Sequence, residues 1–302
     1  MPFINIGDIN MYYRVFASGT GIELETIDQN ASTMIVLHGG FGILDHQIEL
    51  PAWQPFSSSV QLIFIDQRGH GRTDDGDPNR WTMDQFGDDI LNFCQALQIY
   101  KPIVGGVSAG GYAAIAYAIR HPSHPGGLVL ADTEPLVSPG AKATLFQSIG
   151  DRHDRHEFQA FEGMSDAEIK DFAKNAAEAS RAYDANPTAE NFSNFGKYCF
   201  PIISKKFFEL TPPIRTNMAM KNRLANGYKQ FDYSTQIHTI DCPVLWLAGD
   251  RAPIHPPVCA VEGAKQVKNV ELKILQAGDP VYQDQPEQFR ELVLSFIKKV
   301  LV

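Results

Sequence analysis

Short apolar runs alternate along the chain with longer segments in which apolar residues recur every three or four positions. Runs that are apolar on both faces and rich in Val, Ile and Leu predict strands of a parallel sheet covered by helices. Six such runs lie at 33–40, 60–67, 101–108, 127–134, 242–249 and 270–278. The segments at 83–99 and 110–122 have the spacing of amphipathic or buried helices. The alternation predicts an α/β doubly wound fold with a mostly parallel central sheet and helices on both faces.

One block interrupts this alternation. From about residue 138 to residue 237 no strand-like run occurs, and the sequence is helical in pattern and rich in aromatic residues. A block of this kind, inserted between two strands, must lie at an edge of the sheet as a helical cap. We therefore expect a core domain of residues 1–136 and 238–302, and a cap of residues 137–237 inserted after the strand at 127–134.

Length and composition narrow the class of protein. The chain has 302 residues, which suits a single α/β domain with an insertion, and a formal net charge of −9. Its Lys and Arg residues are spread out, so we expect no nucleic-acid partner. The N-terminus lacks a signal-peptide pattern, and no run of about 18 apolar residues occurs, so we expect a cytoplasmic protein with no membrane partner. The sequence does not indicate an oligomeric state.

The four cysteines are scattered and lack the spacing of a metal site. Cys94, Cys199, Cys242 and Cys259 form no CxxC pair. This pattern fits reduced, buried thiols better than disulfides or zinc ligands. We expect no metal and no cofactor.

The segment with the clearest chemistry is Gly106–Gly110, which reads G-x-S-x-G. It lies directly between a predicted strand and a predicted helix. Glycines allow a sharp strand-to-helix turn that holds the serine in a strained conformation with its hydroxyl above the sheet. Ser108 is therefore the candidate nucleophile.

A second glycine-rich segment, HGGFG, follows the strand at 33–40. A backbone N–H of Gly40 or Phe41, together with the N–H of Ala109, would form an oxyanion hole beside Ser108. We expect His38 to hold this loop by hydrogen bonds. Asp66, Arg68 and His70, in the segment DQRGHGRTD, are expected to organise the loop after their own strand in the same way.

With these segments in order, the chain resembles the α/β-hydrolase superfamily. HGGFG, DQRGHGRTD and the helix after G-x-S-x-G are most similar to the branch of proline iminopeptidases and related ester and lactone hydrolases. The resemblance covers the predicted core and leaves the cap unassigned.

The resemblance implies a Ser-His-Asp triad, yet two of its three positions differ here. Ala252 stands where the branch has its aspartate, and Asp279 stands after Gly278 where the branch has its histidine. Loss of a triad member leaves only the residual catalysis of the oxyanion hole and of substrate binding. The sequence therefore predicts weak or absent hydrolysis.

Three residues are candidates for the missing roles. Asp279 itself could act as the base if burial raised its pKa, or it could be a hydrogen-bonded loop residue. His255 lies in a segment that is expected to turn away from Ser108. Glu134 follows a strand at the place where some family members carry their acid, and it could instead line the pocket.

Three functions remain open at this point. The chain is a catalyst with an altered centre, including a lyase, decarboxylase or cyclase; a ligand-binding pseudoenzyme; or a serine hydrolase whose acid and base have been replaced. We expect aromatic residues of the cap to form mostly its core, and if a few reach the cleft they favour a small, largely apolar ester, lactone or amide as substrate. These residues are Phe158, Phe161, Phe192, Phe195, Tyr198, Phe200, Phe207 and Phe208.

Overall fold

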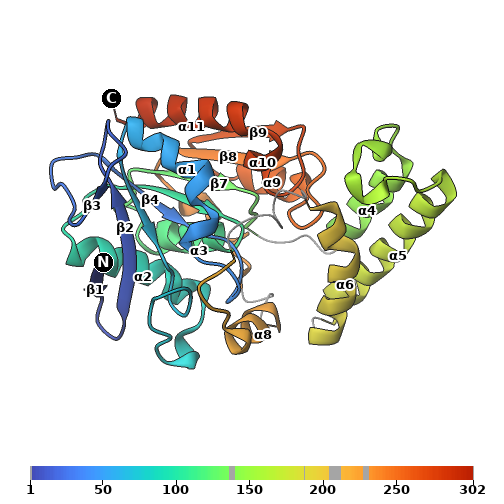
Figure 1. Cartoon of the computed structure of the whole chain (residues 1–302), viewed down its shortest axis with the longest axis horizontal. Coiled ribbons are helices and arrows are strands. Elements are labelled where there is room, and N and C mark those ends of the chain that lie inside the picture. Colours follow the sequence, from blue (N-terminus) through green and yellow to red (C-terminus); the bar gives the residue numbers. More distant parts are fainter. Residues whose placement is uncertain (1, 136–139, 187, 204–211, 227–230, 302) are drawn as a thin grey trace.

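A computed structural model describes residues 2–135, 140–186, 188–203, 212–226 and 231–301 of the chain. Figure 1 shows a central sheet between layers of helices, with a group of helices (α4, α5 and α6) standing to one side of it. Both described ends of the chain lie in the sheet-containing part.

The six strands predicted from the apolar runs are all present, and they pair in parallel in the order β5-β4-β6-β7-β8-β9. β2 pairs antiparallel with β5 and extends the sheet through β1, and β3 pairs with β2. The strand bounds are β1 Phe3–Asn5, β2 Asn10–Phe16, β3 Glu23–Leu24, β4 Thr33–Leu37, β5 Gln61–Ile65, β6 Ile103–Val107, β7 Gly127–Ala131, β8 Val244–Gly249 and β9 Val270–Leu275.

Helices cover both faces of this sheet. The α-helices of the sheet-containing part are α1 Leu50–Trp53, α2 Met83–Ala96, α3 Ala109–Arg120, α9 Pro257–Ala264, α10 Val281–Asp284 and α11 Pro286–Val300. Short 3-10 helices are η1 His46–Ile48, η2 Gln54–Ser58, η3 Pro78–Arg80 and η7 Ile237–Thr239.

The strand side chains alternate between two hydrophobic clusters, which explains why the runs are apolar at every position. In β4, Ile35 and Leu37 pack with α2, α3 and α9, whereas Met34 and Val36 pack with α1 and α11. Successive strand residues point to opposite faces, so a sheet covered on both sides needs apolar residues throughout. The predicted fold class is confirmed.

The segment between β7 and β8 contains helices and, among its described residues, no strand. The helices are α4 Ala141–Asp151, η4 Arg155–Glu157, η5 Gln159–Phe161, α5 Asp166–Ala185, α6 Ala189–Ile202 and α8 Met218–Asn226. Ser165 and Glu168 form a capping box at the start of α5. Buried residues of α4, α5 and α6 form a hydrophobic cluster separate from the two that flank the sheet. We call this segment the cap; its exact boundaries at 136/137 and 237/238 stay a prediction.

All four cysteines are buried as free thiols. Most of the cap aromatics named above that can be placed belong to the cap cluster, as expected, either buried or packed against it; Phe207 and Phe208 lie outside the described residues. Within the described ranges, no helix combines the length and the apolar character that crossing a membrane requires.

Candidate functional site

Ser108 lies at the sharp turn between β6 and α3, which we call the elbow. Its backbone has φ 49° and ψ −115°, a conformation that non-glycine residues rarely adopt. The turn is held because the Ser108 carbonyl accepts hydrogen bonds from the N–H of Gly111 at 2.9 Å and of Tyr112 at 3.2 Å. The strained conformation predicted from G-x-S-x-G is therefore present.

The two glycines of the motif are required by close backbone contacts. A Cβ at Gly106 would lie 2.5 Å from the carbonyl oxygen of Gly110, and a Cβ at Gly110 would lie 2.4 Å from that of Leu37. Real Cβ atoms do not approach so closely, so α3 can start directly over the ends of β4 and β6 only with glycine here.

The HGGFG loop lies beside Ser108. A Cβ placed on Gly39 would be 3.4 Å from the Cβ of Ser108. Gly40 has φ 76°, a left-handed conformation that glycine adopts without strain. Gly40 and Phe41 line the same cavity as Ser108, and Ala109 supplies the first N–H of α3. An oxyanion hole formed by the N–H groups of Gly40 or Phe41 and of Ala109 stays a prediction.

Two buried histidines hold this loop. His38 has this role as expected, whereas His70 was expected to organise only the loop after its own strand. Nε2 of His38 accepts a hydrogen bond from the N–H of Gln67, and Nε2 of His70 accepts one from the N–H of Gly42. Burial lowers the pKa of His38 to about 4 and that of His70 to about 3. Both rings are therefore neutral near pH 7, and each can accept a hydrogen bond.

Arg68 also has the expected role of organising its loop. Its guanidinium is fully buried and pairs with both carboxylate oxygens of Asp89 at 2.8 Å, and with Asp8 at 2.8 and 2.9 Å. Bidentate pairs of this kind fix geometry as well as charge.

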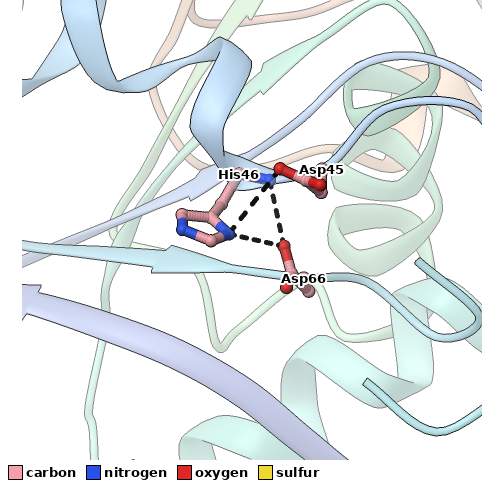
Figure 2. A group of neighbouring side chains, drawn as sticks. All are labelled: Asp45, His46 and Asp66. Atoms are coloured by element: carbon pink, nitrogen blue, oxygen red, sulfur yellow. Dashed lines mark hydrogen bonds and ion pairs between the residues drawn. The ribbon is translucent and has the colours of Figure 1, made fainter. Parts of the chain in front are cut away.

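Asp45, His46 and Asp66 form a compact buried cluster (Figure 2). Nδ1 of His46 lies 2.7 Å from Oδ1 of Asp66. The remaining carboxylate oxygens accept hydrogen bonds from backbone N–H groups. Oδ2 of Asp66 accepts one from Arg72. Oδ1 of Asp45 accepts one from Gln47, and Oδ2 of Asp45 accepts one from Ile214. Because the carboxylates already have hydrogen-bond partners, the cluster is better suited to fixing the conformation of these loops than to binding a metal ion.

A cavity of about 190 Å³ lies between the sheet-containing part and the cap. Its described lining includes Ser108, Gly40 and Phe41 from the elbow and the HGGFG loop, and apolar side chains of the cap. Phe192, Phe195 and Phe200 of α6 reach it, whereas Phe158 and Phe161 pack inside the cap.

The structure corrects the expectation that the segment around His255 turns away from Ser108. His255 lines the cavity together with Ser108 and Asp279. Its Nδ1 lies 3.0 Å from Oδ1 of Asp279, and Oδ2 of Asp279 accepts the N–H of Ile254 at 2.9 Å. Both side chains are only 6% exposed. Asp279 is thus a hydrogen-bonded loop residue, paired with a histidine that the linear sequence did not place beside it.

β8 and β9 explain how these two residues meet. The strands pair in parallel, with Ala248 opposite Ile274 and Gly249 opposite Leu275. The loops after them therefore leave the same edge of the sheet. His255 and Asp279, which are far apart in the chain, belong to those two loops.

Ala252 and Glu134 do not reach the cavity. Ala252 is buried, and it is absent from the described lining. Glu134 is fully buried and accepts a hydrogen bond from the Tyr112 hydroxyl at 2.9 Å. Asp132, two residues earlier at the end of β7, lines the cavity instead.

Two buried acids in the cavity were not found from the sequence. Asp132 has φ 47°, and its Oδ2 accepts the N–H of Val281, while Oδ1 is buried without a hydrogen bond. Burial, followed by the nearby charge of Asp279, raises the pKa of Asp132 well above its ordinary value. Burial likewise raises the pKa of Glu49 to about 7, although Glu49 accepts hydrogen bonds from Trp53 Nε1 and the N–H of Gly39. The features that mark these two acids are the left-handed backbone of Asp132 and the buried surroundings of both side chains, and neither feature is visible in the sequence.

Comparison with known proteins agrees with the observed fold. The family model described as alpha/beta hydrolase fold matches residues 32–285. The chain is 26% identical to proline iminopeptidase PfmaB of Pestalotiopsis fici, across 99% of this chain and the whole of that protein. It is 23% identical to the proline iminopeptidase of Heyndrickxia coagulans, across 96% of this chain and the whole of that protein.

Solved structures show the same fold. The enol-lactonase of Burkholderia xenovorans LB400 superimposes with a TM-score of 0.63 at 17% identity, covering 98% of this chain and all of that one. A thermophilic esterase of Thermogutta terrifontis gives a TM-score of 0.60 at 21% identity, covering 97% of this chain and 94% of that one.

Proposed function

Because the chain belongs to the α/β-hydrolase fold family, we propose that it hydrolyses small, largely apolar esters, lactones or amides with Ser108 as nucleophile. The proposal rests mainly on one observation: a serine in the strained elbow conformation shares a cavity with a buried His255–Asp279 pair. The relatives include peptidases and a lactonase by name, which agrees with acyl-transfer chemistry.

His255 is the proposed general base. When its Nδ1–H donates to Asp279, Nε2 is left as the nitrogen that can accept the Ser108 proton. In the family pattern that the sequence resembles, the histidine follows the last strand and the acid follows the strand before it. Here the two are exchanged: histidine after β8, carboxylate after β9. The exchange makes an acid at Ala252 unnecessary.

The proposed reaction follows the general acyl-transfer scheme. Ser108 Oγ attacks the substrate carbonyl as His255 takes the hydroxyl proton of Ser108. The resulting oxyanion accepts hydrogen bonds from the N–H groups of Gly40 or Phe41 and of Ala109. The imidazolium then protonates the leaving group, and the C–O or C–N bond breaks. Water attacks the acyl-enzyme by the same steps. One oxyanion donor is typically worth about a hundredfold to a thousandfold in rate.

This proposal changes the expectation about rate. Weak or absent hydrolysis was predicted because position 279 has no histidine. His255 provides an imidazole in the same cavity. We accordingly expect turnover rather than residual activity. A pseudoenzyme would bind ligand in this cavity without turnover.

Non-hydrolytic chemistry is the second candidate, and the buried acids favour it. Asp132 and Glu49 hold protons more tightly than ordinary carboxyls, so either could donate a proton to a bound substrate. A lyase, decarboxylase or cyclase of this kind would need the acids but would not need an acyl-serine.

Labelling with a fluorophosphonate separates these functions, since only an activated serine reacts rapidly. We expect stoichiometric labelling of the chain and none of Ser108→Ala. His255→Ala should slow labelling and hydrolysis of p-nitrophenyl butyrate by at least about 10⁴-fold. The matched control is His238→Ala, which removes an exposed histidine. Rapid labelling of His255→Ala would rule out His255 as the base, and an unreactive wild-type chain that binds ligands would favour the pseudoenzyme.

A further inference from the structure

β9 is the last strand of the sheet, and among the described residues it pairs only with β8. The strands that end the sheet on its other side are short: β1 has three residues and β3 has two, whereas β9 has six. A long edge strand presents a row of unpaired N–H and C=O groups that another strand can pair with. β9 is therefore the edge at which the sheet could continue into a second molecule.

The ladder between β8 and β9 shows which backbone groups of β9 face outwards. The carbonyl of Asn269 accepts the N–H of Val244, and the carbonyl of Leu275 accepts the N–H of Asp250, both at 2.8 Å. Successive residues of a strand in a parallel ladder direct their N–H and C=O groups alternately to its two sides. The even-numbered residues of β9 therefore direct theirs away from β8, and these residues are Val270, Leu272 and Ile274.

The side chains of β9 are arranged symmetrically about Leu272. Val270 and Leu272 pack at the margin of the hydrophobic cluster that includes α9, and Ile274 is 40% exposed. On the other face, Glu271 and Lys273 lie on either side of Leu272, with exposed side chains 3.3 Å apart. Rotation of this strand by a half-turn about Leu272 exchanges a negative position with a positive one.

We propose that two copies of this chain pair through antiparallel β9 strands, about a two-fold axis that passes through Leu272. Leu272 then lies opposite the partner's Leu272, Val270 opposite the partner's Ile274, and Glu271 opposite the partner's Lys273. A two-fold axis of this kind makes a closed dimer in which both copies use the same surface. The inference concerns an interaction surface and does not depend on the hydrolysis proposed for Ser108.

Hydrogen bonding and charge select the same register. The outward-facing residues form the hydrogen-bonded pairs, so Glu271 and the partner's Lys273 form a non-hydrogen-bonded pair, in which side chains approach most closely. A shift by one residue would place outward-facing groups opposite groups already bonded to β8. A shift by two residues would place Glu271 opposite the partner's Glu271, or Lys273 opposite the partner's Lys273, and like charges directly opposite are destabilising.

Charge reversal tests this pairing. Two six-residue strands form a small interface, so we expect a wild-type Kd of about 10 to 100 μM. Glu271→Lys brings lysines together at both charge pairs, and Lys273→Glu brings glutamates together, so each variant should raise Kd at least about tenfold. A mixture of the two variants should form a heterodimer about as tight as the wild-type dimer, because opposite charges again face each other. Neither variant keeps the ion pair within its own strand, so this recovery can come only from contacts between chains.

Sedimentation equilibrium over concentrations that bracket the wild-type Kd gives these values, with a dye on one variant in the mixture. The matched control is Glu178→Lys, which makes the same charge change at an exposed position of α5 and should leave Kd unchanged. Ile274→Lys is a second variant at the edge: it places a charge opposite the apolar Val270 of the partner subunit and should also weaken the dimer. Urea unfolding checks that each variant is folded.

Three results would each overturn the proposal: a wild-type chain that stays monomeric throughout this range, a dimer that persists unchanged in both charge variants, or a mixture of the two variants that stays monomeric. The last result would show that any wild-type dimer uses another register or another surface.

Discussion

Replacing Asp279 with asparagine tests the proposed pair most directly, because it changes hydrogen bonding and leaves the shape almost unchanged. Asp279 accepts two N–H groups, from Ile254 at 2.9 Å and from His255 Nδ1 at 3.0 Å. Asparagine has one acceptor oxygen and one NH₂ donor. It can therefore satisfy only one of the two donors.

Either orientation of the amide impairs the site. If the oxygen faces Ile254, the NH₂ donates to Nδ1 of His255, and the imidazole proton moves to Nε2, which can then no longer accept a proton from Ser108. If the oxygen faces His255, two N–H groups oppose each other at Ile254 in a buried place. His255 then keeps its proton on Nδ1, but the opposed N–H groups lower the free energy of unfolding by about 1–3 kcal/mol.

The expected loss in kcat/KM for Asp279→Asn is about 10³ to 10⁴-fold, or about 4 to 5.5 kcal/mol of transition-state stabilisation. The loss in unfolding free energy should be smaller than this. Hydrolysis of a p-nitrophenyl ester and urea unfolding measure the two quantities on the same protein. Asp250→Asn is the control, because Asp250 lies on the loop that carries His255 and accepts the N–H of Ala277 from the loop of Asp279, but it is not part of the described cavity lining.

A double-mutant cycle sharpens the test. His255→Ala combined with Asp279→Asn should be no slower than His255→Ala alone, because the carboxylate acts only through the imidazole. An Asp279→Asn chain within about tenfold of wild type, or fully additive losses in the cycle, would refute the proposed orientation of His255 by Asp279.

Two further predictions concern neighbouring positions. Asp279→His alone should lower ester hydrolysis, because His255 loses its partner. Adding Ala252→Asp should recover part of the rate, because it places a histidine and an acid at the family positions. A double mutant no faster than Asp279→His would show that these loops do not converge on Ser108. Burial raises the pKa of Glu49 from 4.5 to about 7, so the folded state binds this proton more tightly than the unfolded state, and stability should fall by about 3 kcal/mol as pH rises through that interval. Urea unfolding of Glu49→Gln at acidic and mildly alkaline pH should show a smaller fall than wild type, and an identical pH dependence would contradict the buried, proton-holding Glu49.

The sequence by itself determined the parallel strands, the elbow and the glycine-rich HGGFG loop. The six apolar runs became parallel strands because a sheet covered on both faces needs apolar side chains at every position. The elbow followed from glycines at 106 and 110, where the close approach of backbone atoms excludes any Cβ. Signals of this kind are local, so they can be read along the chain. The antiparallel strands β1–β3 have no comparably apolar run and went unpredicted.

Only the tertiary structure decided which side chains share the cavity with Ser108. The linear pattern predicted a missing histidine at 279 and a missing acid at 252, but it could not show that two adjacent parallel strands bring His255 against Asp279. Nor could it show that Asp132, rather than Glu134, lines the cavity. The direction of a loop side chain depends on contacts between distant segments, and no periodicity along the sequence records those contacts.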